Sequence, residues 1–502
     1  MRNTFAPINR IPPDVLSLIP DYWGHRAEKD TIVLTHVCHG WREIFTSRSS
    51  LWTHLDCRST EKTRVYIERS RSHPLEISLT RSKCISYCND ALLIAVPHIG
   101  RLGSLTISVP SNTLSHLFVY FPFPAPFLKE LKIDLDIPSN HTGPDPVIPS
   151  TIFPDHLSPL HKLSLSGVVT DLPWRNLSNL TVFEFRHVPH TVDPLFMGQL
   201  LDFLESAPLL RKISLRDSIP NSFTVPPGRA ISLLDLEKLI VHGLPAHSTF
   251  LNHLHIPTGA SLDLRFSFSA GGPLIPVCLP NNFGNHNITT INLLVNTPPW
   301  TRMRLDGPSG ELRACGNLRQ WDNGSFFRSL ARIDLSRTRK LSVAVGDSAP
   351  WKKFEDSPIF QTLLLTKGLH TLTLVNVDNL PFICALNPGL NESHITLCPE
   401  LKELVIYIIE HDRFLPERLM AMASERAKRF SKLQSITIIN LGGHDHPREE
   451  VFSLREYISR VEYKWEFSLP HWDAVFEGRA GHGDYSSGFA AILLERGPSE
   501  SY

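Results

Sequence analysis

Two cysteines in the first fifth of the chain have a spacing that could serve metal binding. Cys84 and Cys88 lie four positions apart, with His73 and His98 nearby. A structural zinc site needs four ligands, usually arranged as two pairs, and no second cysteine pair follows at a finger-like distance. The favoured interpretation is therefore that both cysteines are small core residues.

A second metal-like cluster lies near the carboxyl end. His444 and His446 flank one aspartate in Gly-Gly-His-Asp-His, residues 442–446. Glycines next to short polar side chains are typical of a turn after a strand. We interpret this cluster as a polar turn, and the sequence predicts neither a bound metal nor a cofactor.

The motifs of several large enzyme classes are missing from the sequence. Its 24 histidines form no His-Glu-x-x-His pair, and it contains no Gly-x-Ser-x-Gly elbow and no Walker-type phosphate loop. This favours a protein that is not an enzyme. A metal-dependent enzyme hidden in the divergent middle of the chain stays open as an alternative. The basic run at residues 426–429 is interpreted as a solvated helix face rather than a nucleic-acid contact.

Composition indicates an ordinary globular protein of more than one module. The 502 residues are 42% hydrophobic and 20% charged, and 50 Lys and Arg balance 50 Asp and Glu. Zero net charge does not favour nucleic acid or an anionic membrane as the main partner. The first residues lack the apolar core of a signal peptide, and no apolar run reaches the roughly 20 residues that span a bilayer. Eight scattered cysteines then predict reduced thiols in the cytoplasm or nucleus.

The elements that precede the cysteines form a small helical module. Pro13 and Asp14 suit the first turn of a helix over residues 11–19, whose apolar face would comprise Val15, Leu16 and Ile19. A second helix is expected from about Asp30, as a capping residue, to Phe45. Its stripe would include Val33, Val37, Trp41 and Ile44 at helical spacing. From spacing alone, a cap on the following domain and a docking module for another protein are equally open.

Three motifs in order carry a resemblance. Ile-Pro-Pro-Asp-Val-Leu at residues 11–16, Val-Cys-His-Gly-Trp-Arg at 37–42 and Leu-Trp at 51–52 are together similar to the F-box. The match covers residues 8–56 and departs from the family pattern at Pro20 and in a longer first connection. The resemblance implies binding to the Skp-family adaptor of a cullin-RING (SCF) ubiquitin ligase. The residues at motif positions are Ile11, Pro12, Val15, Leu16, Ile19, Val37, Cys38 and Trp41.

After the module, one helix and one strand are expected before the rest of the chain. Thr60 could cap a helix over residues 61–71, which Pro74 would stop. Residues 75–79 then alternate apolar and polar, as a strand does. We assign residues 57–98 to this helical linker and first strand.

The remaining chain repeats the phrase apolar-x-x-apolar-x-apolar. Strong copies begin at residues 128, 160, 210, 236, 330, 369, 401 and 433, and weaker copies at 102, 180 and 288. Such periods suit a solenoid in which each repeat adds one strand to a parallel sheet. Within each strand the alternate leucines would point inward. Between about 244 and 330 the period is blurred, and from 447 it is lost.

The phrase resembles the irregular leucine-rich repeats found behind many F-boxes. The resemblance implies an α/β fold: a small helical F-box and an irregular leucine-rich-repeat solenoid with a curved parallel sheet. The repeat domain would span residues 99–446, and residues 447–502 a cap and tail. The implied function is a substrate-recognition adaptor that holds a protein target, with an enzyme recruited elsewhere. A repeat scaffold not coupled to ubiquitination is the alternative.

Overall fold

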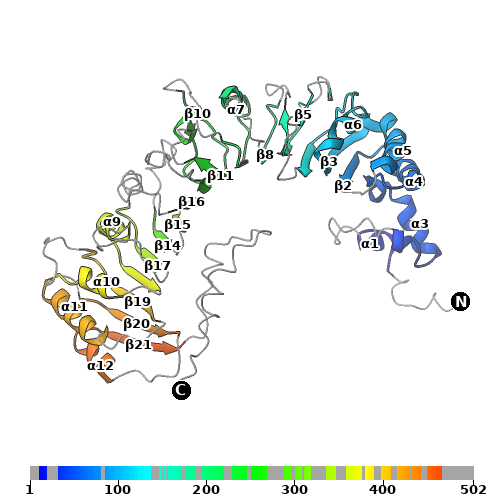
Figure 1. The fold of residues 1–502 in the computed structure, drawn as a ribbon. Helices are drawn as coiled ribbons and strands as arrows, with labels where there is room; N and C mark the ends of the chain where they lie inside the picture. Colours follow the sequence, from blue (N-terminus) through cyan, green and yellow to red (C-terminus); the bar gives the residue numbers. More distant parts are fainter. Residues whose placement is uncertain are drawn as a thin grey trace, which may run out of the picture. The chain divides into compact units, whose positions relative to one another are not determined.

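A computed structural model divides the chain into two compact units, Met1–Ala260 and Ser261–Tyr502 (Figure 1). The structure describes residues 11–19, 32–80, 85–136, 146–149, 152–153, 157, 159–170, 177–186, 194–219, 229–245, 250–267, 288–295, 300–307, 310–317, 335–345, 358–375, 379–388, 397–408, 415–429, 432–441 and 449–465. None of the helices within these ranges is both long and apolar enough to cross a membrane.

The first unit begins with short helices. Helix α1 covers Pro13–Ser17, with a proline in its first turn as expected, and residues 32–35 form one further helical turn. Helix α3 covers His39–Ser47 and is followed by the 3-10 helix η4, Ser49–Trp52. Pro20 and the connection at 24–29 lie outside the described residues.

The expected single helix from Asp30 to Phe45 is wrong, because the backbone breaks between residues 36 and 38. Cys38 is extended, with φ −159° and ψ 174°, and it caps α3 instead of continuing a helix. The Nε of Arg42 donates to the carbonyl of Thr35 at 2.9 Å. This bond uses a carbonyl that the break releases, which explains how the chain tolerates a turn inside an apolar stripe. Asp30 itself lies outside the described residues.

Eight of the described strands of the first unit pair side by side, all in parallel. Their order in the sheet is β1 (His54–Leu55), β2 (Leu75–Thr80), β3 (Leu102–Pro110), β4 (Glu130–Asp136), β6 (Lys162–Ser166), β8 (Val182–Arg186), β9 (Lys212–Arg216) and β11 (Lys238–Pro245). Two short parallel pairs accompany them: β5 (Val147–Ile148) with β7 (Val169–Thr170), and β10 (Ile231–Ser232) with β12 (Leu254–His255).

Helical segments connect these strands. They are α4 (Thr60–Ser70), α5 (Ile85–Ala95), η5 (Val96–Arg101), η6 (Ser111–Thr113), α6 (Leu114–Phe118), α7 (Pro194–Ser206) and η8 (Phe250–His253). Within the unit, α4 to α7 lie to one side of the strands (Figure 1). The cap of α4 is Ser59, whose hydroxyl accepts from the backbone N–H of Lys62 at 3.3 Å, rather than the expected Thr60. A separation of three residues between the capping side chain and the N–H that donates to it is the usual N-cap geometry.

The inward side chains of the sheet form two apolar rows. One row runs through the first inward position of successive strands and the other lies two residues further along, as the pleat requires. The first row contains Leu105, Leu131, Leu163, Phe183, Ile213 and Leu239, and the second contains Ile107, Ile133, Leu165, Phe185, Leu215 and Val241. All twelve are buried. The repeated phrase therefore places one leucine-like pair per strand in a common core.

The second unit also consists of strands with helical connections. Its described strands are β13 (Ser261–Ser267), β14 (Thr290–Val295), β15 (Trp300–Gly307), β16 (Gly310–Asn317), β17 (Lys340–Val345), β18 (Thr371–Val375), β19 (Glu403–Ile408), β20 (Ser435–Asn440) and β21 (Arg460–Trp465). The helices are α9 (Pro358–Leu365), α10 (Asn379–Leu386), α11 (Leu415–Arg429), α12 (Glu449–Ser453) and η12 (Leu454–Glu456).

The sheet of the second unit is not parallel throughout, which corrects the expected parallel array. Strands β14, β17, β18, β19, β20 and β21 are parallel neighbours, but β14–β15 and β15–β16 are antiparallel, and β16 returns parallel to β13. Gly307 pairs with Gly310, so two residues separate β15 from β16. So short a connection joins antiparallel strands, whereas a parallel pair needs a crossover. This hairpin is the reason that the period blurs there.

The predicted register of the last repeats is confirmed. Leu372, Leu404 and Ile436 are partners across β18, β19 and β20, and Leu374, Ile406 and Ile438 form the next row. The first-position leucines 369, 401 and 433 are buried with them. The repeats extend beyond residue 447, where the sequence pattern was lost. Val461 of β21 pairs with Ile436 and continues the inward row.

One predicted copy has the wrong register. The copy at residues 330–335 predicts that Leu335 lies in a strand. In the structure Leu335 lies in the turn before β17, and residues 330–334 are outside the described ranges. The inward positions of β17 are Leu341 and Val343, preceded by the fully buried Thr338. Sequence pattern missed this copy because a threonine occupies its first apolar position.

Arg426 corrects the interpretation of residues 426–429 as a solvated face. Its side chain is only 1% exposed. Its guanidinium donates to the carbonyls of Leu386 at 3.3 Å, Leu397 at 3.2 Å and Cys398 at 2.6 Å. Burial lowers the pKa of Arg426, and burial also raises the pKa of the neighbouring Cys398 to about 12. The thiol therefore stays neutral. Backbone carbonyls accept from both terminal nitrogens of Arg426, whereas its buried Nε has no partner among the described residues.

Candidate functional site

The helical module has a compact core of its own. Leu16 of α1, Leu34 of the 32–35 turn, and Trp41 and Phe45 of α3 form one buried cluster. The rings of Trp41 and Phe45 meet edge to face, with centroids 5.5 Å apart. Three short segments are thus held together by four side chains, which explains why none of them needs to be a long helix.

The structure divides the eight residues predicted for adaptor binding into two groups. Leu16 and Trp41 are buried in the core, and Ile11, Ile19 and Cys38 are half-buried against it. The other three face outward: Pro12 is exposed, and Val15 and Val37 are each 49% exposed. The expectation that Val15 and Leu16 share one apolar face is wrong, because adjacent residues on a helix point about 100° apart.

Further apolar side chains that the motif did not name are exposed on the same segments. Leu18 is 47% exposed and lies three residues from Val15, while Val33 is 61% exposed and lies four residues from Val37. We call Val15, Leu18, Val33 and Val37 the outward apolar set. Val15 and Leu18 lie on or next to α1, which supplies Leu16 to the core, and Val33 and Val37 lie on or next to the turn that supplies Leu34. Helical spacing already grouped Val15, Val33 and Val37 as apolar positions in the sequence, and only Leu18 was not named.

Trp52 fixes the module to the strands that follow. It is 1% exposed, its Nε1 donates to the carbonyl of Phe45 at 2.9 Å, and the Arg69 guanidinium lies 4.4 Å from its ring centroid. The Tyr66 ring meets Trp52 edge to face at 5.0 Å. Because Arg69 and Tyr66 belong to α4, the module and the start of the sheet are packed as one body.

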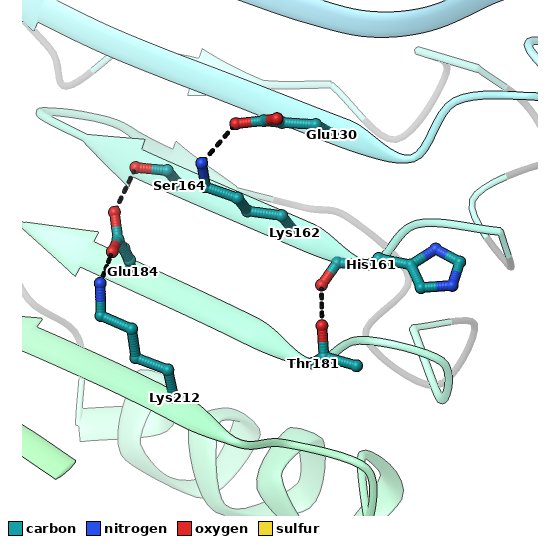
Figure 2. A network of polar contacts seen from close by, with 7 residues as sticks. All are labelled: Glu130, His161, Lys162, Ser164, Thr181, Glu184 and Lys212. Carbon is teal, nitrogen blue, oxygen red and sulfur yellow. Dashed lines mark hydrogen bonds and ion pairs between the residues drawn. The ribbon is translucent and has the colours of Figure 1, made fainter. Parts of the chain in front are cut away.

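The outward face of the first-unit sheet is polar and cross-linked. Lys162 pairs with Glu130 at 2.5 Å, Lys212 pairs with Glu184 at 2.5 Å, and the Ser164 hydroxyl donates to Glu184 at 3.3 Å (Figure 2). These bonds cross from β4 to β6, and from β6 and β9 to β8. At the start of the strands, the Thr181 hydroxyl donates to the carbonyl of His161 at 3.0 Å. The outward side chains therefore hold one another in place before any partner arrives.

Glu184 is the carboxylate at the centre of this network. Its burial opposes ionisation, but the hydrogen bond and charge of Lys212, the hydrogen bond from Ser164 and the charge of Lys162 outweigh burial and lower its pKa. A carboxyl whose pKa is lower in the folded chain stabilises the fold fully above the ordinary value of 4.5. That contribution is lost as the pH falls through the lower folded-state pKa.

Replacing Glu184 with glutamine should therefore flatten the acid side of the stability profile. Between about pH 3 and 5, the unfolding free energy of the first unit should fall less steeply with acid than in the wild type. Denaturant titrations across this range would measure the slope. Glu237→Gln is the control, since its ion pair with Arg211 spans 3.6 Å between exposed side chains. Equal slopes for wild type and Glu184→Gln would contradict the assignment.

No group of three or more potential metal ligands occurs among the described residues. His73 is exposed beyond the end of α4. The side chains of Cys84 and Cys88, as well as His444 and His446, lie outside the described residues, so both cysteine and histidine predictions stay predictions.

Comparison with known proteins adds no family. No family model matches the chain, and no curated protein matches it. The structure therefore shows a mixed α/β fold with largely parallel sheets.

Proposed function

We propose that this chain is a substrate-recognition adaptor of an SCF-type ubiquitin ligase. Residues 8–56 bind the Skp-family adaptor as an F-box, and the strands that follow form a leucine-rich-repeat solenoid that holds a protein target. The chain works in the cytoplasm or nucleus without a cofactor, nucleic acid or membrane. It is not an enzyme, because its effect is to raise the concentration of the target near a ubiquitin donor held elsewhere in the complex.

The observation that carries the proposal is the outward apolar set on a module that already has its own core. Leu16 and Trp41 are buried in that core, whereas Val15 and Val37 are exposed and do not contribute to its packing. Each of these valines is 49% exposed, so burying its exposed half against a partner contributes roughly 1 kcal/mol. Contiguous exposed apolar surface commonly marks a protein contact, and the members of each pair, Val15 with Leu18 and Val33 with Val37, lie three or four residues apart on one segment. The order of the three F-box motifs suggests which partner makes that contact.

The repeat assignment is supported by the strand register. Parallel strands separated by 20 to 32 residues present inward pairs at the same positions, as in β4, β6 and β8, and again in β18, β19 and β20. One such unit cannot bury its apolar edge alone, whereas stacked neighbours can. The polar outward face then remains available for a target.

Charge placed in the outward apolar set should abolish adaptor binding. In Val15→Asp plus Val37→Asp, a carboxylate must be desolvated at the contact without a partner, so affinity for a purified Skp-family adaptor should fall at least about tenfold. Isothermal titration or pull-down with purified adaptor measures this. Val119→Asp plus Leu93→Asp is the matched control, since both residues are exposed apolar side chains outside residues 8–56.

The chain lacking residues 1–56 gives the baseline for complete loss of adaptor binding. Leu16→Asp is unsuitable as a test because it would disrupt the module core itself. Wild-type adaptor affinity in a folded Val15→Asp plus Val37→Asp variant would refute the docking surface. Target capture without adaptor by the wild type would instead point to the scaffold that is not coupled to ubiquitination.

A further inference from the structure

The outward face of the first-unit sheet changes its charge along the sheet. On β4 the outward residues Glu130, Lys132 and Asp134 are mostly acidic. On β8, β9 and β11 the outward residues that share register include four basic side chains and one acidic one: Arg186, Lys212, Arg216, Lys238 and Glu184. The two halves of the same polar face are therefore suited to different partners.

Within the described part of the chain, three of those four basic residues lack a counter-charge. Lys212 is neutralised by Glu184. By contrast, Arg186, Arg216 and Lys238 form no ion pair within 4.0 Å with any residue that the structure describes. Arg186 and Lys238 are exposed, and Arg216 is half-buried. The acidic residues next to them along the chain are Asp217, which is exposed, and Glu237, which pairs with Arg211.

The register places like charges directly side by side. Arg186 on β8 is the partner of Arg216 on β9, and Arg216 is in turn the partner of His242 on β11. Parallel neighbours are about 4.8 Å apart, and like charges opposite one another destabilise a sheet. Lys212 and Lys238 repeat the arrangement four residues earlier. This arrangement of like charges does not stabilise the fold, whereas it would strengthen the binding of an anionic partner.

We propose that β8, β9 and β11 bind an acidic segment of the protein target, through Arg186, Arg216 and Lys238. Lys238 precedes His242 by four residues, so the cations are spread over roughly 13 Å along the strand direction. That spread suits several carboxylates on one extended peptide, rather than one phosphate held at a single point. Guanidinium groups also bind carboxylates through paired hydrogen bonds. This inference deepens the proposed function, on which it rests for calling the bound protein a target.

The test uses the full chain and two fluorescent peptides of equal length, one of alternating glutamate and serine and one of alternating lysine and serine. Anisotropy at low and moderate salt should show binding of the glutamate peptide only, weakening as salt screens the charges. Arg186→Gln plus Arg216→Gln should weaken it at least tenfold. Arg64→Gln plus Lys432→Gln, which removes two exposed charges elsewhere, should leave it within twofold.

Stability distinguishes a lost contact from a lost fold. Because the Arg186–Arg216 pair is repulsive, the double glutamine variant should melt at the same temperature as the wild type or higher while binding falls. Arg216→Glu should separate the two effects further, since it places an opposite charge beside Arg186. A lower melting temperature in both variants would overturn the reasoning that the pair serves binding rather than the fold.

Other outcomes of the same assay also decide the proposal. Equal binding of the two peptides, or equal loss in the Arg64 and Lys432 control, would overturn it. Tighter binding of single-stranded oligothymidine than of the glutamate peptide at the same salt would show a nucleic-acid surface and overturn the protein assignment. No Skp-family adaptor is present in these measurements. Failure here therefore leaves the adaptor-binding result untouched, and failure there leaves the acidic-peptide result untouched.

Discussion

Replacing Arg426 with alanine should lower the unfolding free energy of the second unit by about 2–6 kcal/mol, because two buried carbonyls lose their charged donor at about 1–3 kcal/mol each. The guanidinium joins three separate places: the last residue of α10, at Leu386, and the carbonyls of Leu397 and Cys398 in the turn before β19. The carboxyl end of α10 carries partial negative charge, which favours a cation there. Alanine would remove this donor from all three carbonyls. The Cys398 carbonyl would keep the backbone N–H of Leu401 at 3.1 Å, whereas the loss at the Leu386 and Leu397 carbonyls would cost about 1–3 kcal/mol each.

Two further variants at or near this position sharpen the test. Lys428→Ala, in the same helix but exposed, should change stability by less than about 0.5 kcal/mol. Arg426→Met removes both the donor and the cost of burying a charge. This variant should still destabilise the fold, because the Leu386 and Leu397 carbonyls lose the same donor. Denaturant titration measures all three. A methionine variant as stable as the wild type would mean that desolvation of the guanidinium offsets its hydrogen bonds.

Leu404→Ala should cost roughly 2–5 kcal/mol, the usual loss for a fully buried leucine. Leu404 is completely buried and lies between Leu372 of β18 and Ile436 of β20. The cavity would open against both neighbouring strands. Hydrogen exchange should therefore quicken first in β18, β19 and β20, while the amides of α1 and α3 keep their protection.

Glu403→Ala is the matched control, one position earlier on the same strand. Glu403 is exposed and accepts a hydrogen bond from the Thr371 hydroxyl at 3.0 Å. An exposed bond of this kind contributes little, so the variant should stay within about 0.5 kcal/mol of the wild type. Equal effects of the two changes would mean that the inward register of β19 does not control stability.

The inward residues of the sheet could be predicted from the sequence, whereas the helix boundaries of the amino-terminal module could not, for a physical reason. A strand has a period of two, so Leu404 and Ile406 could be assigned to the interior from their spacing, and Leu401 from the repeated phrase that precedes each strand. The turn at Cys38 could not be foreseen, because the apolar stripe from Val33 to Ile44 fits an unbroken helix equally well. The break at Cys38 is accompanied by a bond between Arg42 and the Thr35 carbonyl, which a periodic pattern does not encode.

For the candidate site, the motif identified a stretch of chain but not the direction of each side chain. Val15 and Leu16 are adjacent in the motif, yet one is exposed and the other belongs to the core. Which of two neighbouring apolar residues turns inward depends on where Leu34 and Phe45 lie, and that is a property of packing. The outward apolar set is therefore defined only by the way α1 and α3 pack on their common core.

The sequence by itself determined the mixed α/β class and the inward leucines of the regular repeats, because local periodicity specifies these features. The antiparallel hairpin of β15 and β16 and the pairing of β16 with β13 became known only from the tertiary structure. Tertiary structure decided where charges end up. The sequence predicts Arg426 to be a surface residue. In the fold, carbonyls from α10 and from the turn before β19 accept hydrogen bonds from its buried side chain. Arg186 and Arg216 are 30 residues apart, and only the register of β8 and β9 makes them neighbours. Charge interactions act through space, so their partners depend on packing that no local pattern contains.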